Sequence, residues 1–207
     1  MLHVVTCLWD ANQHSLPGSR CYDETWVNKL AAGVRRHLPL RHRFVVFTDR
    51  EREFAPGIDQ ERLTAAKPDY GSFTEPYRLN EPMILMGLDT LIIGPLDAFW
   101  NHCLKAEKIA LPRDPYQPDR SINGVALVPA GQRAIWDDWR GENDMEWLRS
   151  KDTDFIDDLF PGAVLSMKFH DVRRKGLQGA RIVYFHGKPK MQEMMNMPWV
   201  RENWRAD

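Results

Sequence analysis

The sequence lacks the features that mark several common classes of protein. Its 207 residues include three cysteines and no Cys-x-x-Cys pair, which argues against a disulfide framework or a zinc site and predicts a reducing, cytoplasmic location. It has no Gly-x-Ser-x-Gly motif, no Gly-x4-Gly-Lys motif, and no Gly-x-Gly-x-x-Gly fingerprint after its first strand-like run. These absences disfavour esterases, P-loop nucleotide hydrolases and dinucleotide-binding dehydrogenases.

Net charge and long apolar runs are also missing. The chain has 28 Lys and Arg against 29 Asp and Glu, a net charge of −1, which excludes a globally basic nucleic-acid binder. The longest apolar stretch, residues 83–96, is interrupted by Asp89, so no segment is long enough to span a bilayer. The chain opens on a strand-like run rather than a charged and then apolar leader, so no secretion signal is expected.

Short apolar runs and amphipathic segments alternate along the chain. Residues 3–9 and 43–48 predict buried strands, and between them apolar side chains recur every four residues on one face of a helix that Pro39 ends. This order predicts a βαβ unit with a parallel sheet. Further strands are expected at residues 83–86, 91–93, 108–111, 124–128 and 181–185, helices at 132–139, 144–150 and 153–160, and loops at Pro17-Gly18 and 50–76.

No repeat, low-complexity tract or linker divides the chain. We therefore expect one α/β domain over residues 1–207, with a mostly parallel central sheet flanked by helices. Residues 191–207 are expected to form a C-terminal tail that packs near the site. The eight tryptophans are expected to serve mostly in packing, with Trp9 placed to stack on a ligand at the end of the first strand.

Polar residues follow the expected strands, where ligands bind in open α/β sheets. They are Asp10, Asn12, Asp49, Asp89 and His186. Asp89 lies between two apolar strands, where a carboxylate must be paired, hydrated or metal-bound. A carboxylate with an imidazole suits a divalent metal such as Mn²⁺, and Lys188 and Lys190 can neutralise a diphosphate.

Several segments, in their order along the chain, resemble those of GT-A-fold glycosyltransferases. The small bacterial and phage relatives of the glycogenin and lipopolysaccharide-galactosyltransferase group are the most similar. Leu88-Asp89-Thr90, followed by Gly94-Pro-Leu-Asp97, resembles the Asp-x-Asp segment of that group. The other matching segments are Cys7-Leu-Trp9, Val45-Val-Phe-Thr-Asp49, Ser121-Ile-Asn-Gly-Val-Ala-Leu127, Asp152-Thr-Asp-Phe-Ile156 and Phe185-His-Gly-Lys-Pro-Lys190.

The resemblance implies transfer of a sugar from a nucleotide-diphosphate sugar, with UDP as the expected nucleotide, to an acceptor hydroxyl. Asp89 and His186 would bind Mn²⁺ or Mg²⁺. The donor would contact Thr6, Trp9, Asp49, Arg78, Asp89, Lys188 and Lys190. Asn123 and Asp154 would line the sugar and acceptor side. Asp154 or Asp152 would be the base of an inverting enzyme, although the resemblance favours retention, which needs no dedicated base.

One position departs from the family pattern. Gly87 stands where the first carboxylate of Asp-x-Asp is expected. If both carboxylates are needed, metal affinity falls, catalysis fails, or a Lys or Arg replaces the metal. The alternative function is therefore a nucleotide-sugar-binding protein with weak or lost activity.

A basic cluster at residues 35–43 leaves one more alternative open. It is either a solvated helix end or, together with residues 173–175, a phosphate-binding patch. The second interpretation would make the acceptor a modified DNA base. The other acceptors considered are a glycan, a protein and a small molecule.

Overall fold

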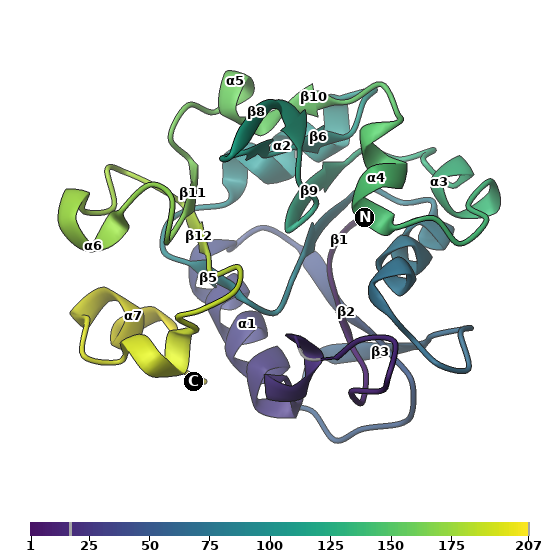
Figure 1. Ribbon diagram of the computed structural model, residues 1–207, viewed down its shortest axis with the longest axis horizontal. Helices are drawn as coiled ribbons and strands as arrows, with labels where there is room; N and C mark the ends of the chain where they lie inside the picture. Colours follow the sequence, from purple (N-terminus) through teal and green to yellow (C-terminus); the bar gives the residue numbers. More distant parts are fainter. Residues whose placement is uncertain (17, 207) are drawn as a thin grey trace.

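The structure is a computed structural model that describes residues 1–16 and 18–206, so the loop expected at Pro17 lies partly outside the described residues. Its centre is a seven-stranded sheet in the order β10-β6-β9-β4-β1-β2-β3 (Figure 1). These strands are β1 (Leu2–Leu8), β2 (His42–Thr48), β3 (Ile58–Arg62), β4 (Met83–Met86), β6 (Ala110–Leu111), β9 (Val125–Val128) and β10 (Asp154–Phe155).

The central sheet is mostly parallel. Only β9 runs antiparallel to its neighbours, β4 and β6. Every residue of β1 is buried, as expected for a parallel strand covered on both faces. The predicted α/β class with a mostly parallel central sheet is confirmed.

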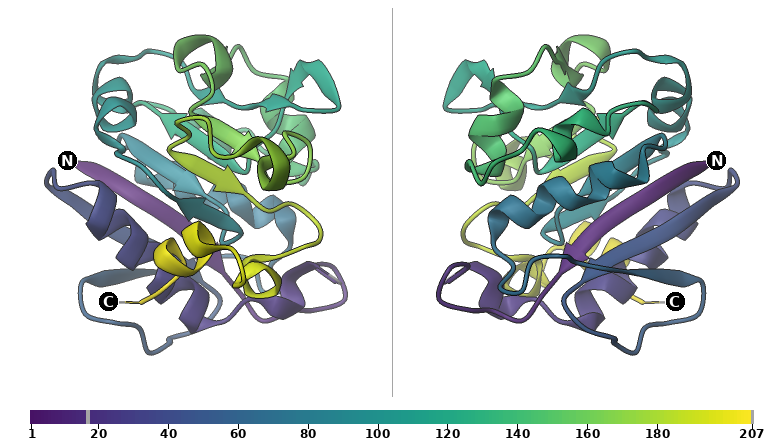
Figure 2. Two further views of the ribbon diagram at one scale, coloured as in Figure 1. Left: turned by 90° about the vertical axis from the view of Figure 1, so that its left-hand side faces the viewer. Right: turned by 90° about the vertical axis from the view of Figure 1, so that its right-hand side faces the viewer.

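Side chains of alternate residues along the strands fill a separate hydrophobic core on each face of the sheet. Val4, Val46 and Ile84 pack with α1 (Glu24–His37) and α2 (Asp97–Lys105). Val5, Phe47 and Leu85 pack on the other face, which is covered by η2 (Tyr70–Leu79), α3 (Ala134–Asp137) and α4 (Asp144–Arg149). Figure 2 shows helices on both sides of the sheet.

Helix α1 forms where the four-residue spacing of apolar side chains predicts it. The Asp23 side chain caps it by accepting hydrogen bonds from the backbone N–H groups of Thr25 and Trp26. Trp26, Leu30 and Val34 are buried on one face. The expected βαβ unit is confirmed, because β1 and β2 pair in parallel on either side of α1 in the sequence.

Two smaller sheets lie beside the main one. β5 (Thr90–Ile92), β11 (Val164–Ser166) and β12 (Ile182–Tyr184) form a three-stranded sheet, and β7 (Arg113–Asp114) pairs with β8 (Gln117–Ser121). The chain passes from β4 in the central sheet to β5 in the second sheet through residues 87–89. The Phe185 N–H donates to the Asp89 carbonyl over 2.8 Å, which brings the end of β12 against this turn.

The C-terminal segment packs against α1 (Figure 1). After β12 come η3 (Met191–Met194) and α7 (Pro198–Asn203). The Trp204 ring lies 5.0 Å from the Trp26 ring, and the Lys29 ammonium lies 3.5 Å from the centre of the Trp204 ring. Met191 is fully buried. This segment is therefore anchored to the core. The remaining short helices are η1 (Gly18–Cys21), α5 (Ile156–Leu159) and α6 (Val172–Lys175).

Some expected elements differ in the structure. Residues 153–160 were expected to be helical, but they begin with strand β10, in which Asp154 pairs with Ala110, and only then form the one-turn helix α5. The segment expected to be a loop at 50–76 contains β3 and the start of η2. β3 is an edge strand with little apolar patterning (Ile-Asp-Gln-Glu-Arg), so its pairing with β2 determines its conformation.

Candidate functional site

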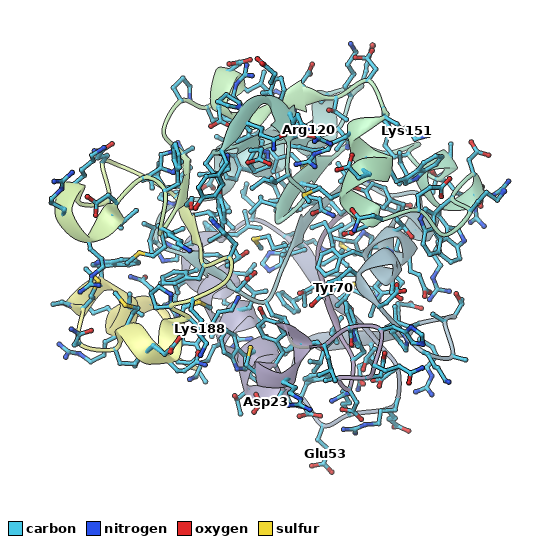
Figure 3. All side chains as sticks on the ribbon, viewed as in Figure 1. Asp23, Glu53, Tyr70, Arg120, Lys151 and Lys188 are labelled. Carbon is cyan, nitrogen blue, oxygen red and sulfur yellow. The ribbon has the colours of Figure 1, made fainter. Side chains whose placement is uncertain are left out.

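A pocket of about 180 Å³ opens where β1 and β4 end at the carboxyl edge of the sheet. This is where ligands bind in open α/β sheets. Figure 3 shows Tyr70, one of its lining residues, near the centre of the molecule. The lining residues are Cys7, Leu8, Trp9, Ser19, Tyr22, Tyr70, Phe73, Gly87, Leu88, Asp89, Asn123, Gly124 and Asp144.

Aromatic rings form one wall of the pocket. The Trp9 ring packs edge-on against Tyr70 and Phe73, with ring centres 6.5 Å and 6.4 Å away. Tyr70 is fixed by a 2.9 Å hydrogen bond from its hydroxyl to the Ser15 carbonyl, yet 44% of its surface is exposed. The buried Trp9 indole N–H has no hydrogen-bond partner among the residues that the structure describes.

Asp89, another lining residue, forms an ion pair with Lys190. Asp89 follows Gly87 and Leu88 in the turn between β4 and β5, and Lys190 precedes η3. The Lys190 Nζ lies 2.6 Å from Asp89 Oδ2 and 2.8 Å from the Phe185 carbonyl oxygen. The Lys190 side chain is only 12% exposed.

Tyr22 lies next to this ion pair. The Lys190 ammonium is 5.4 Å from the centre of its ring. Burial, together with the Asp89 charge, raises the pKa of the Tyr22 hydroxyl well above its usual range, so the phenol stays neutral.

Asp144 is the pocket carboxylate that sequence reasoning missed. It is buried at the first turn of α4, accepts a hydrogen bond from the Asn123 side chain, and has its pKa raised by burial. An acidic residue at a helix start usually stabilises the helix dipole, so its sequence position carries no sign of a site. The sequence does predict Asn123 as a site residue, but only the folded structure shows that its side chain contacts Asp144.

His186 does not line the pocket. Its Nδ1 lies 3.4 Å from the Ser166 hydroxyl, while its buried Nε2 has no hydrogen-bond partner within residues 1–16 and 18–206. Burial lowers the pKa of the imidazole, although the Asp89 charge acts against this. Its ring also lies 6.0 Å from that of Tyr116, which is exposed on the β7–β8 hairpin.

The residues around Asp89 do not fit a divalent metal. In the part of the chain that the structure describes, no group of three or more His, Cys, Asp or Glu side chains could hold a metal ion. Gly87 supplies no ligand, and Lys190 already neutralises the Asp89 carboxylate. The Mn²⁺ or Mg²⁺ expected from the sequence stays a prediction, without a ligand set among the described residues.

Asp49 and Thr6 lie near the strand ends but outside the pocket lining. Arg52, whose side chain is 2% exposed, donates to Asp49 Oδ1 and Asp10 Oδ1 over 2.8 Å each. Asp49 also accepts from the Asp10 backbone N–H. Asp49 is therefore engaged within the protein. Thr6 is fully buried in β1, and its hydroxyl has no hydrogen-bond partner in the described part of the chain.

The structure does not bring Arg78, Asp152 or Asp154 to the pocket. Arg78 donates to the Arg62 carbonyl and lies 4.0 Å from Glu75. Asp152 is 79% exposed and forms a 2.7 Å ion pair with Lys108. Asp154 lines a separate shallow hollow with His102 and Lys105. Pairing of the two-residue strand β10 with β6 places Asp154 there.

Lys188, labelled in Figure 3, is exposed in the loop between β12 and η3, two residues before Lys190. The basic cluster at residues 35–43 contributes to intramolecular contacts. Arg36 donates to the Asn203 carbonyl over 2.7 Å, and Arg43 pairs with Asp59 at 2.8 Å. These contacts tie part of the cluster to α7 and β3.

No protein-family profile matches the chain, and no curated protein matches its sequence. Solved structures do match. The galactosyltransferase LgtC, in complex with donor and acceptor sugar analogues, aligns with a TM-score of 0.59 and 11% identity over 96% of this chain and 93% of LgtC. The glycosyltransferase GlyE of Streptococcus pneumoniae TIGR4 aligns with a TM-score of 0.56 and 12% identity, covering 97% of this chain and 62% of GlyE.

The bifunctional glycosyltransferase WbbM aligns with a TM-score of 0.57 and 10% identity over 98% of this chain, which spans 51% of WbbM. These similarities establish a shared fold. The resemblance to GT-A glycosyltransferases that the sequence motifs indicate is confirmed at that level. Among the described helices, none has the length and apolar character needed to cross a membrane.

Proposed function

We propose that this chain is a glycosyltransferase that moves a sugar from a nucleotide-diphosphate sugar, with UDP as the expected nucleotide, to an acceptor hydroxyl. The observation that carries the proposal is the pocket at the carboxyl ends of β1 and β4. Aromatic rings and the buried Asp144 carboxylate line it, and the Lys190 ammonium is fixed on Asp89, another lining residue. The fold is shared with a galactosyltransferase whose structure holds donor and acceptor sugar analogues.

The aromatic wall supports binding of the nucleoside. Trp9, Tyr70 and Phe73 give a flat base an apolar surface. Asp49 would act on this side indirectly, because Arg52 holds both it and Asp10 at the ends of β2 and β1.

The lysines support binding of the diphosphate. Sugar transfer leaves negative charge on the departing diphosphate, and a preorganised cation stabilises that charge in the transition state. Lys190 is fixed at the edge of the pocket, and exposed Lys188 is two residues away along the same loop.

Asp144 and Asn123 support binding of the transferred sugar. A carboxylate oxygen and an amide accept hydrogen bonds from hydroxyl groups, and Asp144 is buried among the pocket residues. Because burial raises its pKa, Asp144 is also the pocket residue best suited to take a proton from an acceptor hydroxyl in an inverting reaction. In a retaining reaction, which the resemblance favours, it would only position the sugar.

A second candidate is a nucleotide-sugar-binding protein with weak or lost activity. Gly87 in place of a carboxylate and the Asp89–Lys190 ion pair favour it, because both depart from the metal-binding pattern of the family it resembles.

Under either function, a cytoplasmic location is proposed from the three cysteines, which are free thiols.

The test is an assay of the purified protein with a panel of nucleotide sugars, measuring donor hydrolysis and transfer to a glycan array by mass spectrometry. We expect turnover with at least one donor and a loss of at least about tenfold in Asp144→Asn. Asp137→Asn, which changes an exposed carboxylate on α3, is the matched control and is expected to behave as the wild type.

The Asp152→Asn and Asp154→Asn variants, assayed in the same way, test the sequence-based prediction that one of these residues is the catalytic base. A large loss in either, with Asp144→Asn unaffected, would contradict the role given to Asp144. Donor binding without hydrolysis or transfer would support the binding-protein alternative, and the absence of any donor binding would refute both.

A further inference from the structure

We propose that the Lys190 ammonium takes the place of the divalent cation, so that this protein binds a nucleoside diphosphate group without a metal. The inference rests on the proposed function, because it concerns how the same pocket holds the donor. It differs from the metal-dependent mechanism that the sequence motifs imply, and it is carried by the contacts around Asp89.

The first observation is the absence of a ligand set. A divalent cation such as Mn²⁺ or Mg²⁺ needs several oxygen or nitrogen ligands directed at one point. In the described residues, no three His, Cys, Asp or Glu side chains meet in this way. Gly87 leaves Asp89 without a neighbouring carboxylate, and His186 faces Ser166 through its Nδ1.

The second observation is that Lys190 is held in position before any ligand binds. Its Nζ contacts Asp89 Oδ2 at 2.6 Å and the Phe185 carbonyl at 2.8 Å. Its backbone N–H donates to the Glu193 carboxylate over 2.8 Å, and the next residue, Met191, is fully buried in the core. A lysine fixed at both its backbone and its ammonium loses little conformational entropy on binding a phosphate.

The Lys190 ammonium also keeps one hydrogen-bond donor for a ligand. An ammonium has three N–H donors, and the two protein acceptors use two of them. The third remains available for a phosphate oxygen. Asp89 then acts as the residue that orients Lys190, rather than as a metal ligand. A fixed cation with a free donor beside the pocket can neutralise part of the charge of a diphosphate.

The two mechanisms predict opposite effects of Asp89→Asn. If Asp89 bound a metal, the amide would weaken the metal site, and binding of UDP would fall. If Lys190 is the cation, the substitution removes the negative charge of Asp89. That charge partly neutralises Lys190 and repels the diphosphate. Binding of UDP should then stay as tight as in the wild type or become tighter.

The experiment measures UDP and uridine binding by titration calorimetry, in excess EDTA and in excess Mn²⁺. In the wild type, we expect the UDP dissociation constant in EDTA to match that in Mn²⁺. Lys190→Met should weaken UDP binding by about tenfold or more and leave uridine binding unchanged, because uridine lacks the diphosphate. Lys105→Met, at the exposed end of α2, is the control and should have no effect on either ligand.

Lys190→Arg keeps the charge and should bind UDP more tightly than Lys190→Met. If Lys190→Met does not fold, the wild-type and Asp89→Asn titrations in EDTA decide the question alone. UDP binding that requires Mn²⁺, or that is lost in Asp89→Asn, would overturn the inference and leave the proposed function standing. Failure of every nucleotide sugar, UDP and uridine to bind under both conditions would instead overturn the proposed function.

Discussion

Replacing Arg52 with methionine tests how the strand ends beside the pocket are held together. The Arg52 side chain is 2% exposed. It donates to Thr48 Oγ1 at 2.8 Å, to Glu24 Oε1 at 2.7 Å, and to Asp10 Oδ1 and Asp49 Oδ1 at 2.8 Å each. Arg52→Met would keep the apolar part of the side chain and remove the cation that contacts all three carboxylates, while Asp10 and Glu24 would keep the exposed Arg50.

The expected cost follows from the burial of the partners. Removing one member of a buried ion pair costs about 3–5 kcal/mol. Asp10 and Glu24 are 61% and 31% exposed, so water can solvate them in the variant, and the loss should lie near the lower limit. About 3 kcal/mol corresponds to a decrease in Tm of about 6–12 °C for a chain of this size.

Thermal denaturation followed by circular dichroism measures this effect. The matched control is Arg50→Met. Arg50 contacts the same Asp10 carboxylate at 2.9 Å from a side chain that is 50% exposed, so its removal should leave Tm nearly unchanged. Equal shifts for the two variants, or an Arg52→Met shift below about 2 °C, would show that burial does not give Arg52 the role assigned to it.

Three further predictions concern the pocket and its surroundings. Burial raises the folded-state pKa of Asp144 above its unfolded value, so ionisation of this carboxyl opposes folding. Thermal denaturation should therefore show that the stability of the wild type, relative to that of Asp144→Asn, falls as pH rises from about 4 toward neutrality. Burial lowers the pKa values of His3, His102, His170 and His186, so the unfolded state binds more protons. Urea denaturation should therefore give a lower free energy of unfolding as pH falls below about 6.5, and a pH-independent value would refute this. Gly87→Asp places a second carboxylate beside Asp89, whose Oδ1 would lie 3.0 Å from the new Cβ and must shift slightly. Because two carboxylates would then be available to a cation, electron paramagnetic resonance should detect Mn²⁺ binding by this variant and not by the wild type.

Much of the fold is predictable from local patterns. β1, α1 and β2 follow from apolar runs and a four-residue repeat, because each buries a continuous surface that the sequence alone displays. Strand β10 does not follow. It has two residues, and its conformation depends on pairing with β6, so the segment around Asp154 is helix-like in sequence and extended in the structure.

The site is predictable only in part. A strand end or a sequence motif predicts Trp9, Asp89 and Asn123 as site residues, and all three line the pocket. Asp144 looks like an ordinary helix start, since only the packing of α4 against η2 brings it there. The contact between Asp89 and Lys190 joins residues 101 positions apart, and no local pattern reports which charge a carboxylate meets after folding.

We infer that the pocket between β1, η2 and the turn at residues 87–89 binds a nucleotide sugar. Gly124 lines this pocket, and a Cβ added there would meet no atom within 4 Å, so a larger side chain fits at this position of the lining without a backbone clash. The most direct measurement is calorimetric titration of nucleotide sugars into the wild type, Gly124→Ala and Gly124→Leu. We expect nucleotide sugars to bind the wild type, to bind Gly124→Ala more weakly and not to bind a folded Gly124→Leu. Equal binding to all three proteins would contradict it.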